Sequence, residues 1–341
     1  MSKRVKLTAV ISTDEDKVLD ETAINNSVGL LGKIESYNIG LDSNDSGNTL
    51  TSNNSNNGVV SEISNFIRDS NKIYFGSLEM DQREAVAVAI VHSANYEKIK
   101  NDTAFSQKII SMFAKKFGKE DSLISKIFSD TDDANLFDTI KSKFLEGDLG
   151  QMFIYIWEKV LSVGEEDDQE VELIETTAEK FSMEKPEIAE TKKQGNERAK
   201  VSKGIDSINS GNTAYNKLKA FEKTVLIALM LTECSTIDGK ISSEDLSQLR
   251  NLLNEQFNFS SNSLTVILEK DLGYSITKKV EQVEVYREKY ELVEFLWERI
   301  LSTESDIKDG EMELIRKMVR RLDISDVESE GARKEVEANL G

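Results

Sequence analysis

A chain of 341 residues is long enough for two or more domains with cores of ordinary size, and its single proline favours long uninterrupted helices. Its 62 acidic side chains outnumber 43 basic ones, and the formal charge of −19 repels nucleic-acid phosphates, which excludes general nucleic-acid binding. The first apolar stretch is too short for a signal peptide, and no window approaches the roughly 18 apolar residues of a membrane span. The only cysteine, Cys234, favours a reducing compartment, so we expect a cytoplasmic protein without direct membrane insertion.

Residues 1–80 differ from the rest of the chain and are predicted to form a small mixed N-terminal extension. RVKLTAVIST alternates well enough for a strand, and the polar tract DSNDSGNTLTSNNSNNG has nothing to bury. After the tract, VVSEISNFIRDS predicts a short amphipathic helix and KIYFGSL predicts a strand. We expect this extension to be an appendage through which protein partners dock.

From residue 81 onward, apolar residues recur at steps of three and four, which predicts amphipathic helices and an all-α fold. The two tryptophans, Trp157 and Trp297, lie in the similar segments IWEKVLS and LWERILS. An acidic turn and a second amphipathic helix follow each segment. Because each tryptophan belongs to an apolar stripe, both are predicted to be core residues and not anchors for a partner.

The similarity between the two halves reaches further back along the chain. Four pairs of matching residues are separated by 140 to 142 positions: Trp157 and Trp297, Glu172 and Glu313, Phe117 and Phe257, and Ile99 and Ile241. A shift that stays nearly constant over roughly 100 positions predicts two duplicated helical-bundle domains.

We place the predicted domains at 81–185 and 214–326. A polar linker at 186–213, which carries the only proline, joins them. An acidic tail at 327–341 follows and is predicted to be a frayed helix. The acidic run EEDDQE at 165–170 is expected to be a solvated turn, with recruitment of a basic partner as the alternative.

The second predicted domain contains an Asp-Gly turn that leads into a helix. Ser242 or Ser243 can cap that helix, and Glu244 and Asp245 then lie in its first turn near the positive end of the helix dipole. On this interpretation the acidic residues are only turn and cap residues.

The alternative interpretation is a weak site for Ca²⁺ or another divalent cation. Hard divalent ions take several oxygen ligands from neighbouring elements. Asp238, Glu244, Glu304 and Asp306 would supply four carboxylates from two turns. The stretch does not follow the helix-loop-helix calcium pattern, because a glycine directly follows Asp238.

The closing segment LVEFLWERILSTESDIKDGEMELIRKMVRRLDIS resembles the last helices of the tellurite-resistance TerB-like family. Members read as an aliphatic run, a tryptophan, an acidic turn and a glutamate before Leu-Ile-Arg. The matching positions are Trp297, Glu304, Glu311, Leu314, Ile315, Arg316, Leu322, Ile324 and Ser325. The resemblance covers 215–325 and, more faintly, 82–183. It implies tandem compact all-helical modules whose acidic turns have been linked to divalent-cation binding.

The chain departs from the family pattern in both acidic turns. Glu304 and Ser305 replace an Asp-Gly pair in the closing turn, and NYEKIKND in the first domain, with Glu97 and Lys98, has lost Asp-Gly altogether. The resemblance therefore implies a first domain without metal and a degraded candidate site in the second. We expect any divalent cation to bind the second domain only.

A Cys/His dyad is the sharpest catalytic hypothesis that the composition allows, because His92 and Cys234 are the only residues of their types. Their separation of 142 matches the shift between the predicted domains, which favours equivalent packing positions. The chain also lacks a Gly-rich phosphate loop, a Gly-x-Ser-x-Gly elbow and a zinc-ligand cluster. We therefore predict that the protein is not an enzyme.

Two classes of function remain. The first is a non-catalytic interaction or scaffolding protein of a cytoplasmic stress-related complex, tuned by divalent cations. The alternative is a structural subunit of a larger assembly, such as a phage virion component. Both imply protein partners, and the second implies an ordered oligomer.

Overall fold

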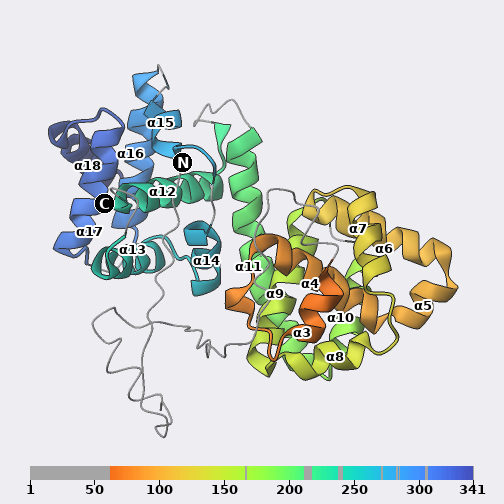
Figure 1. Ribbon diagram of the computed structural model, residues 1–341. Coiled ribbons are helices and arrows are strands. Elements are labelled where there is room, and N and C mark those ends of the chain that lie inside the picture. Colours follow the sequence, from red (N-terminus) through yellow and green to blue (C-terminus); the bar gives the residue numbers. More distant parts are fainter. Residues whose placement is uncertain are drawn as a thin grey trace, which may run out of the picture. The chain divides into compact units, whose positions relative to one another are not determined.

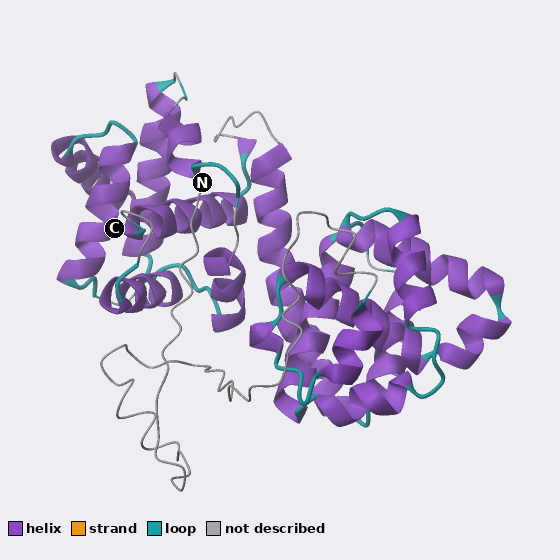
Figure 2. Cartoon of the chain, in the orientation of Figure 1, coloured by secondary structure: helices purple, strands orange, loops and turns teal. Residues whose placement is uncertain are grey.

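The regular structure of the described residues consists of α-helices and one 3₁₀ turn, so the predicted all-α class is confirmed (Figures 1 and 2). The computed structural model describes residues 62–165, 167–210, 217–236, 241–269, 272–281, 283, 285–303 and 306–340. Over these ranges no strand forms, and no helix is long and apolar enough to cross a membrane. The chain divides into two compact units. We call them the N-terminal unit, with described residues 62–210 and 260–266, and the C-terminal unit, with the other described residues.

The N-terminal unit is built around one apolar helix, α4. Its elements are α3 (Ile63–Asp69), η2 (Phe75–Ser77), α4 (Met80–Ala94), α5 (Tyr96–Asn101), α6 (Thr103–Phe117), α7 (Asp121–Asp130), α8 (Leu136–Lys143), α9 (Glu146–Ser162), α10 (Asp168–Lys180) and α11 (Lys185–Ser210). The residues from Ala85 to Val91 are all buried, and α3, α5, α7, α8, α9 and α10 contact this helix. A helix that is apolar on every side needs such a shell of neighbours.

The C-terminal unit has the same plan around helix α12. Its elements are α12 (Ala220–Ser235), α13 (Ser243–Glu255), α15 (Ile276–Glu281), α16 (Tyr286–Leu301), α17 (Asp309–Arg321) and α18 (Asp326–Leu340). The residues from Val225 to Leu231 are buried, and α13, α15, α16 and α17 contact this helix. Helix α14 (Ser261–Glu269) falls across the division, because its residues up to Val266 group with the N-terminal unit.

The order and starting positions of the helices correspond between the two halves of the chain. Seven pairs begin at a nearly constant separation of 140 or 141 positions: α4 and α12, α6 and α13, α7 and α14, α8 and α15, α9 and α16, α10 and α17, and α11 and α18. The first pair also begins alike, because the Glu79 amide donates to Gln82 at 3.0 Å and the Lys219 amide donates to Glu222 at 2.8 Å. The duplication itself stays a prediction, which a superposition of the two units would test.

Residues 62–80 belong to the core of the N-terminal unit and do not form an appendage. The predicted amphipathic helix is confirmed as α3, with Ile63 and Ile67 buried. The predicted strand KIYFGSL is wrong, because Ile73 makes one isolated bridge to Phe144 and η2 follows. Without a neighbouring strand, this apolar segment packs on helices instead. The predicted strand RVKLTAVIST and the Asn/Ser tract lie outside the described residues.

The predicted linker at 186–213 and tail at 327–341 are helices over most of their length. Helix α11 packs on α9, and α18 packs on α16 with Ala332 and Val336 buried. Gly195 permits the first contact, because a Cβ atom there would lie 2.3 Å from the Cβ of Trp157. Both segments are polar overall, yet each has a narrow stripe of small and apolar residues that a bundle can bury. The tail is therefore a packed helix and not a frayed one.

Candidate functional site

Two of the four carboxylates predicted to bind a cation lie within the described residues. Glu244 is in the first turn of α13 and Asp306 precedes α17, and both side chains are exposed. Asp238 and Glu304 lie outside the described residues. Within the part of the chain that the structure describes, no three metal-ligating side chains gather in one place. The cation site therefore stays a prediction.

The predicted cap of the helix after the Asp-Gly turn is confirmed. The amide of Asp245 donates to Ser242 Oγ at 3.0 Å, and the Ser242 hydroxyl donates to the Asp245 carboxylate at 2.8 Å. Glu244 lies beside this cap, near the positive end of the α13 dipole. This capping arrangement accounts for both acidic residues without a bound ion.

A buried ion pair holds the acidic turn of the N-terminal unit in place. Lys116, at the end of α6, is only 3% exposed, and its ammonium donates to the carbonyl oxygens of Val160 and Val163 at 2.7 Å each. The same ammonium lies 2.8 Å from the carboxylate of Glu170. The predicted solvated turn is thus only partly solvated, since Glu165 remains exposed while Glu170 points inward. Lys116 lies on the buried face of α6, three residues after Phe113, but a lysine is ordinarily exposed, so this position was not predicted to be part of the core.

The corresponding place in the C-terminal unit has different chemistry. Gln256 follows Lys116 by 140 positions, is buried and accepts a hydrogen bond from the hydroxyl of Thr303. Glu311 follows Glu170 by 141 positions and is fully buried, and one of its carboxylate oxygens accepts the amide of Lys308 at 3.0 Å. Its other oxygen makes no hydrogen bond with the described residues and lies 3.9 Å from the Lys308 ammonium.

His92 and Cys234 are buried, as predicted, in different units. His92 Nδ1 lies 2.8 Å from Thr131 Oγ1 and the imidazole packs 4.3 Å from the ring of Phe128, so burial lowers its pKa to about 4. Cys234 belongs to the C-terminal unit. Counted from the starts of α4 and α12, His92 corresponds to Thr232 and not to Cys234. By this count the two residues are offset by two positions, and their predicted equivalence stays a prediction.

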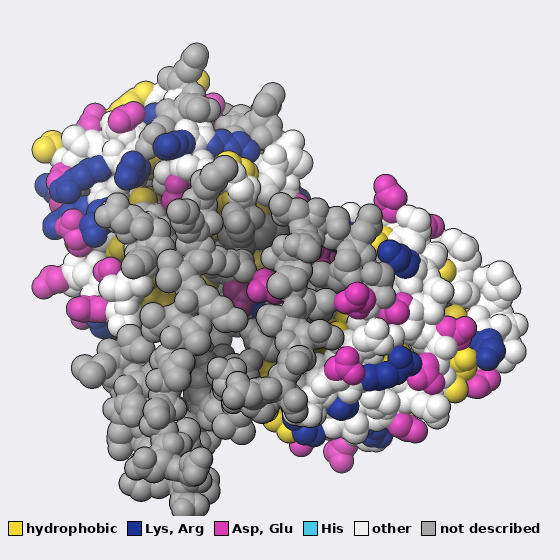
Figure 3. Space-filling view, in the orientation of Figure 1, with side chains coloured by type: hydrophobic (Ala, Val, Ile, Leu, Met, Phe, Trp, Pro, Cys, Tyr) yellow, Lys and Arg dark blue, Asp and Glu magenta, His cyan; other side chains and the backbone are white. Residues whose placement is uncertain are grey.

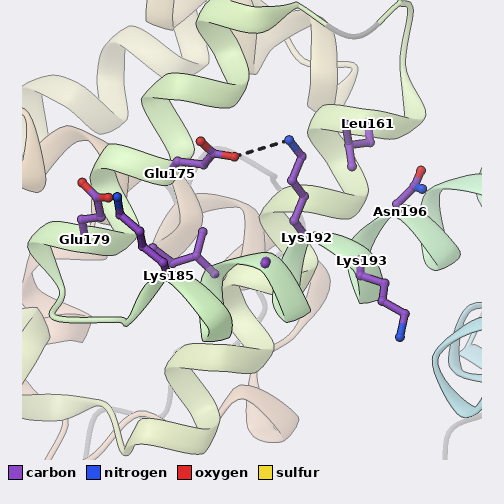
Figure 4. A pocket seen from close by; sticks show the side chains of 9 residues that line it. Leu161, Glu175, Glu179, Lys185, Lys192, Lys193 and Asn196 are labelled. Atoms are coloured by element: carbon purple, nitrogen blue, oxygen red, sulfur yellow. Dashed lines mark hydrogen bonds and ion pairs between the residues drawn. The ribbon is translucent and has the colours of Figure 1, made fainter.

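The N-terminal unit has a wide pocket of about 600 Å³ at α9, α10 and α11, which we call the α10–α11 pocket (Figure 4). Its charged lining residues are Glu175, Glu179, Lys185, Lys192 and Lys193. Figure 4 shows Glu175 turned toward Lys192, and their charged groups are 3.4 Å apart. With two acidic and three basic side chains, the lining is close to charge balance.

The C-terminal unit has a groove of about 540 Å³ at α12, α15 and α17, which we call the α15–α17 groove. Its charged lining residues are Glu233, Lys278, Lys317, Arg320 and Arg321. Glu233 accepts hydrogen bonds from the amide and hydroxyl of Thr277, at 2.9 and 3.0 Å, and from the Ser275 hydroxyl. These bonds fix the start of α15 on α12 and engage Glu233, the one carboxylate among the described lining residues.

The exposed faces of α10 and α17 carry opposite charges at corresponding positions. Glu175 and Glu179 on α10 correspond to Arg316 and Arg320 on α17, at the same separation as the starts of these two helices. Figure 3 shows Lys and Arg side chains gathered over the part of the C-terminal unit where Figure 1 labels α15 to α18. This basic groove was not predicted from the sequence, although the run RKMVRR at 316–321 supplies three of its four cations.

No family model, no curated protein and no solved structure matches this chain.

Proposed function

We propose that this chain is a non-catalytic interaction and scaffolding protein that binds partner proteins through charged recesses on its helical units. One observation carries this proposal: the two recesses described above are open and lined by charged side chains that are exposed or half-buried. A surface of this kind suits reversible contact with charged segments of another protein, because exposed charges steer association and select partners. An enzyme site needs polar groups that converge in a sheltered pocket.

Three buried or half-buried titratable groups of the N-terminal unit support the same proposal, because each is engaged by a packing partner. His92 faces Thr131, and Lys116 joins Glu170 to two carbonyl oxygens. Glu84 pairs with Lys119 at 3.0 Å, and burial still raises its pKa. Groups engaged in this way stabilise the bundle and are not poised for proton transfer to a substrate.

We further propose that a divalent cation tunes the C-terminal unit through Asp238, Glu244, Glu304 and Asp306. The resemblance to TerB-like modules motivates this part of the proposal. Contacts between α13 and α17 support it, because Gly310 at the start of α17 lies against the side chain of Gln248 on α13. Of the candidate ligands that the structure describes, Glu244 lies in the first turn of α13 and Asp306 precedes α17.

Crosslinking of the intact protein in cells of its source, followed by mass spectrometry, tests the interaction function. We expect defined partner proteins crosslinked to lysines of the two recesses, such as Lys185 and Lys193 in one and Lys278 and Lys317 in the other. Native mass spectrometry of the purified chain should give a discrete monomer or dimer. Ordered higher assemblies of the chain alone would support a structural subunit instead, and turnover of a small substrate would overturn the non-catalytic proposal.

A further inference from the structure

The α15–α17 groove presents a row of cations on one helix face. Lys317, Arg320 and Arg321 are spaced i, i+3 and i+4 on α17, so they share a face of the helix, and all three line the groove. Lys278 lines the same groove from α15. Four basic side chains from two elements therefore surround one recess.

The walls of the groove are fixed before any ligand arrives. The adjoining face of α17 is buried through Leu314, Ile315 and Met318, which sets the rotation of the helix. The hydrogen bonds from Thr277 to Glu233 fix the start of α15 on α12. In a preorganised recess, ordering of side chains and backbone on ligand binding costs little free energy.

Two lysines of the groove, Lys278 and Lys317, are available to an anionic ligand. Lys278 and Lys317 make no ion pair with any residue that the structure describes. Arg320 makes a bidentate pair with Asp326, at 2.8 and 3.1 Å, and both side chains are about half exposed, so solvent screens the pair. At Lys278 and Lys317, an anion that enters the groove would therefore meet no ion pair with the described carboxylates.

The basic character of the groove does not follow from the shared helical plan. In the N-terminal unit, the positions that correspond to Lys278, Lys317, Arg320 and Arg321 by the starts of their helices hold Asp138, Thr176, Glu179 and Lys180. The N-terminal unit thus keeps the helices and lacks the charge. In a chain of net charge −19, a local surplus of cations is a specific feature of the C-terminal unit.

We propose that the α15–α17 groove binds an acidic peptide segment of a partner protein. This inference rests on the proposed interaction function and names the chemistry of one partner. Lys317 and Arg321 are separated by one helical turn, about 6 Å of rise, and alternate side chains of an extended peptide are separated by a similar length of about 7 Å. A volume of about 540 Å³ holds several side chains and exceeds what one phosphate fills. A long nucleic acid would also meet the net negative charge of the chain.

Fluorescence anisotropy with a labelled octaglutamate peptide and the full chain tests the proposal. We expect saturable binding that weakens with salt, because exposed charge pairs are screened. The double variant Lys278→Glu/Lys317→Glu should weaken binding at least tenfold. The matched control Lys185→Glu/Lys193→Glu, in the α10–α11 pocket, changes the net charge equally and should weaken binding less than twofold. If circular dichroism shows that the groove variant is misfolded, Lys317→Gln alone should still weaken binding at least threefold.

Three further probes fix the identity of the ligand. Octaglutamine should not bind, and a large excess of inorganic phosphate should not displace octaglutamate. An eight-nucleotide oligothymidine that binds the groove more tightly than octaglutamate would overturn the peptide assignment in favour of a nucleic acid. Equal losses in both double variants, or no binding of octaglutamate at all, would also overturn it. In those cases partner crosslinks elsewhere on the intact protein would leave the interaction function standing, whereas an absence of partners would remove both.

Discussion

The two units share a helical plan and differ in the charges that they place on it. Seven pairs of helices begin at nearly constant separations, and one apolar helix, α4 or α12, lies at the centre of each unit. The polar residues at corresponding places are nevertheless different, both inside the units and on their surfaces. Helix order and apolar spacing therefore determine how each bundle packs, while a few polar positions determine what each bundle can bind.

The tryptophans show how similar packing tolerates different polar surroundings. Trp157 and Trp297 are both buried, and each has a cation over its ring, Lys192 at 5.3 Å and Arg333 at 5.6 Å. These two cations hold corresponding positions on α11 and α18. The indole N–H of Trp297 donates to Ser329 at 3.1 Å, whereas that of Trp157 makes no hydrogen bond with the described residues.

The largest expected effect comes from the buried ammonium that only the N-terminal unit has. Lys116→Met should lower the free energy of unfolding by about 3 to 5 kcal/mol, because it leaves Glu170 and two carbonyl oxygens buried without their partner. Gln256→Met removes the acceptor of the Thr303 hydroxyl and leaves no buried charge of its own, so it should cost about 1 to 3 kcal/mol. Denaturant unfolding of the intact chain, with hydrogen exchange read separately for α6 and α13, measures both losses. Equal losses would show that the two places are energetically alike.

The second expected effect is a pH dependence of stability that comes from His92 in the N-terminal unit. Folded His92 has a pKa of about 4 because it is buried, whereas the unfolded chain takes up the proton near the ordinary value of 6.5. Between these values only the unfolded state binds the proton, so stability should fall as the pH drops from 6.5 to 4 and be unaffected by this group above about pH 7. The loss amounts to about 3 kcal/mol.

Thermal and denaturant melts of the wild type and of His92→Gln across this range isolate the histidine contribution from that of the carboxylates. The difference in stability between the two proteins should change with pH in the stated direction. A difference that stays constant across the range would show that His92 titrates normally in the folded state. Hydrogen exchange of α12 should show no effect of the substitution.

The third expected effect is a change in the free energy of unfolding on Gly→Ala substitution, with opposite signs in α11 and α18. Gly195→Ala in α11 places a Cβ atom 2.3 Å from Trp157 Cβ and 3.0 Å from a carbonyl oxygen, so α9 and α11 must separate, at a cost of about 1 to 3 kcal/mol. Gly331→Ala in α18 meets nothing closer than the Tyr290 hydroxyl at 3.8 Å and should stabilise the chain by about 0.5 to 1 kcal/mol. Unfolding free energies of both variants check the signs. A stabilising Gly195→Ala would contradict the close approach of the two helices.

The apolar pattern was sufficient to predict the helices and much of the core. The steps of three and four residues predicted the all-α class and the burial of both tryptophans, and the spacing of Ser242 from its acidic neighbours predicted the cap of α13. The structure of segments with mixed polar and apolar composition was harder to predict. The polar residues of α11 and α18 hid narrow buried stripes, and KIYFGSL looked like a strand because its apolar residues are dense enough for either packing.

The charged recesses were not predictable, because they depend on which helices meet. Lys278 and Lys317 are far apart in the sequence and line one groove only because α15 and α17 both pack on α12. Helical spacing from Ile109 and Phe113 places Lys116 on the buried face of α6, but the groups that hold its charge come from the end of α9 and from α10. The sequence shows such charges but not the tertiary contacts that bring them together.

The smallest expected effect is a stabilisation by calcium, which should distinguish the acidic turns of the two units. Calcium should stabilise the C-terminal unit by RT ln(1 + [L]/Kd), about 2.7 kcal/mol at a hundredfold excess over Kd. With millimolar affinity, the gain at accessible concentrations is about 1 kcal/mol or less. The N-terminal unit should not respond, because Glu97 and Lys98 lie where an Asp-Gly would be needed, and Lys98 repels a cation. Repulsion among clustered carboxylates, relieved by the ion, is the physical source of the gain.

Melts of the intact chain with calcium or with EDTA, followed by hydrogen exchange of each unit, measure this response. The variant Glu244→Gln/Asp306→Asn should lose it, while Glu165→Gln/Asp168→Asn, which removes the same charge from the acidic turn of the N-terminal unit, should retain it. An equal response of both units, or none in the wild type, would leave Ser242, Glu244 and Asp245 with their capping role alone, which the hydrogen bonds at the start of α13 already explain. In that event the two units would differ in their grooves and not in metal binding.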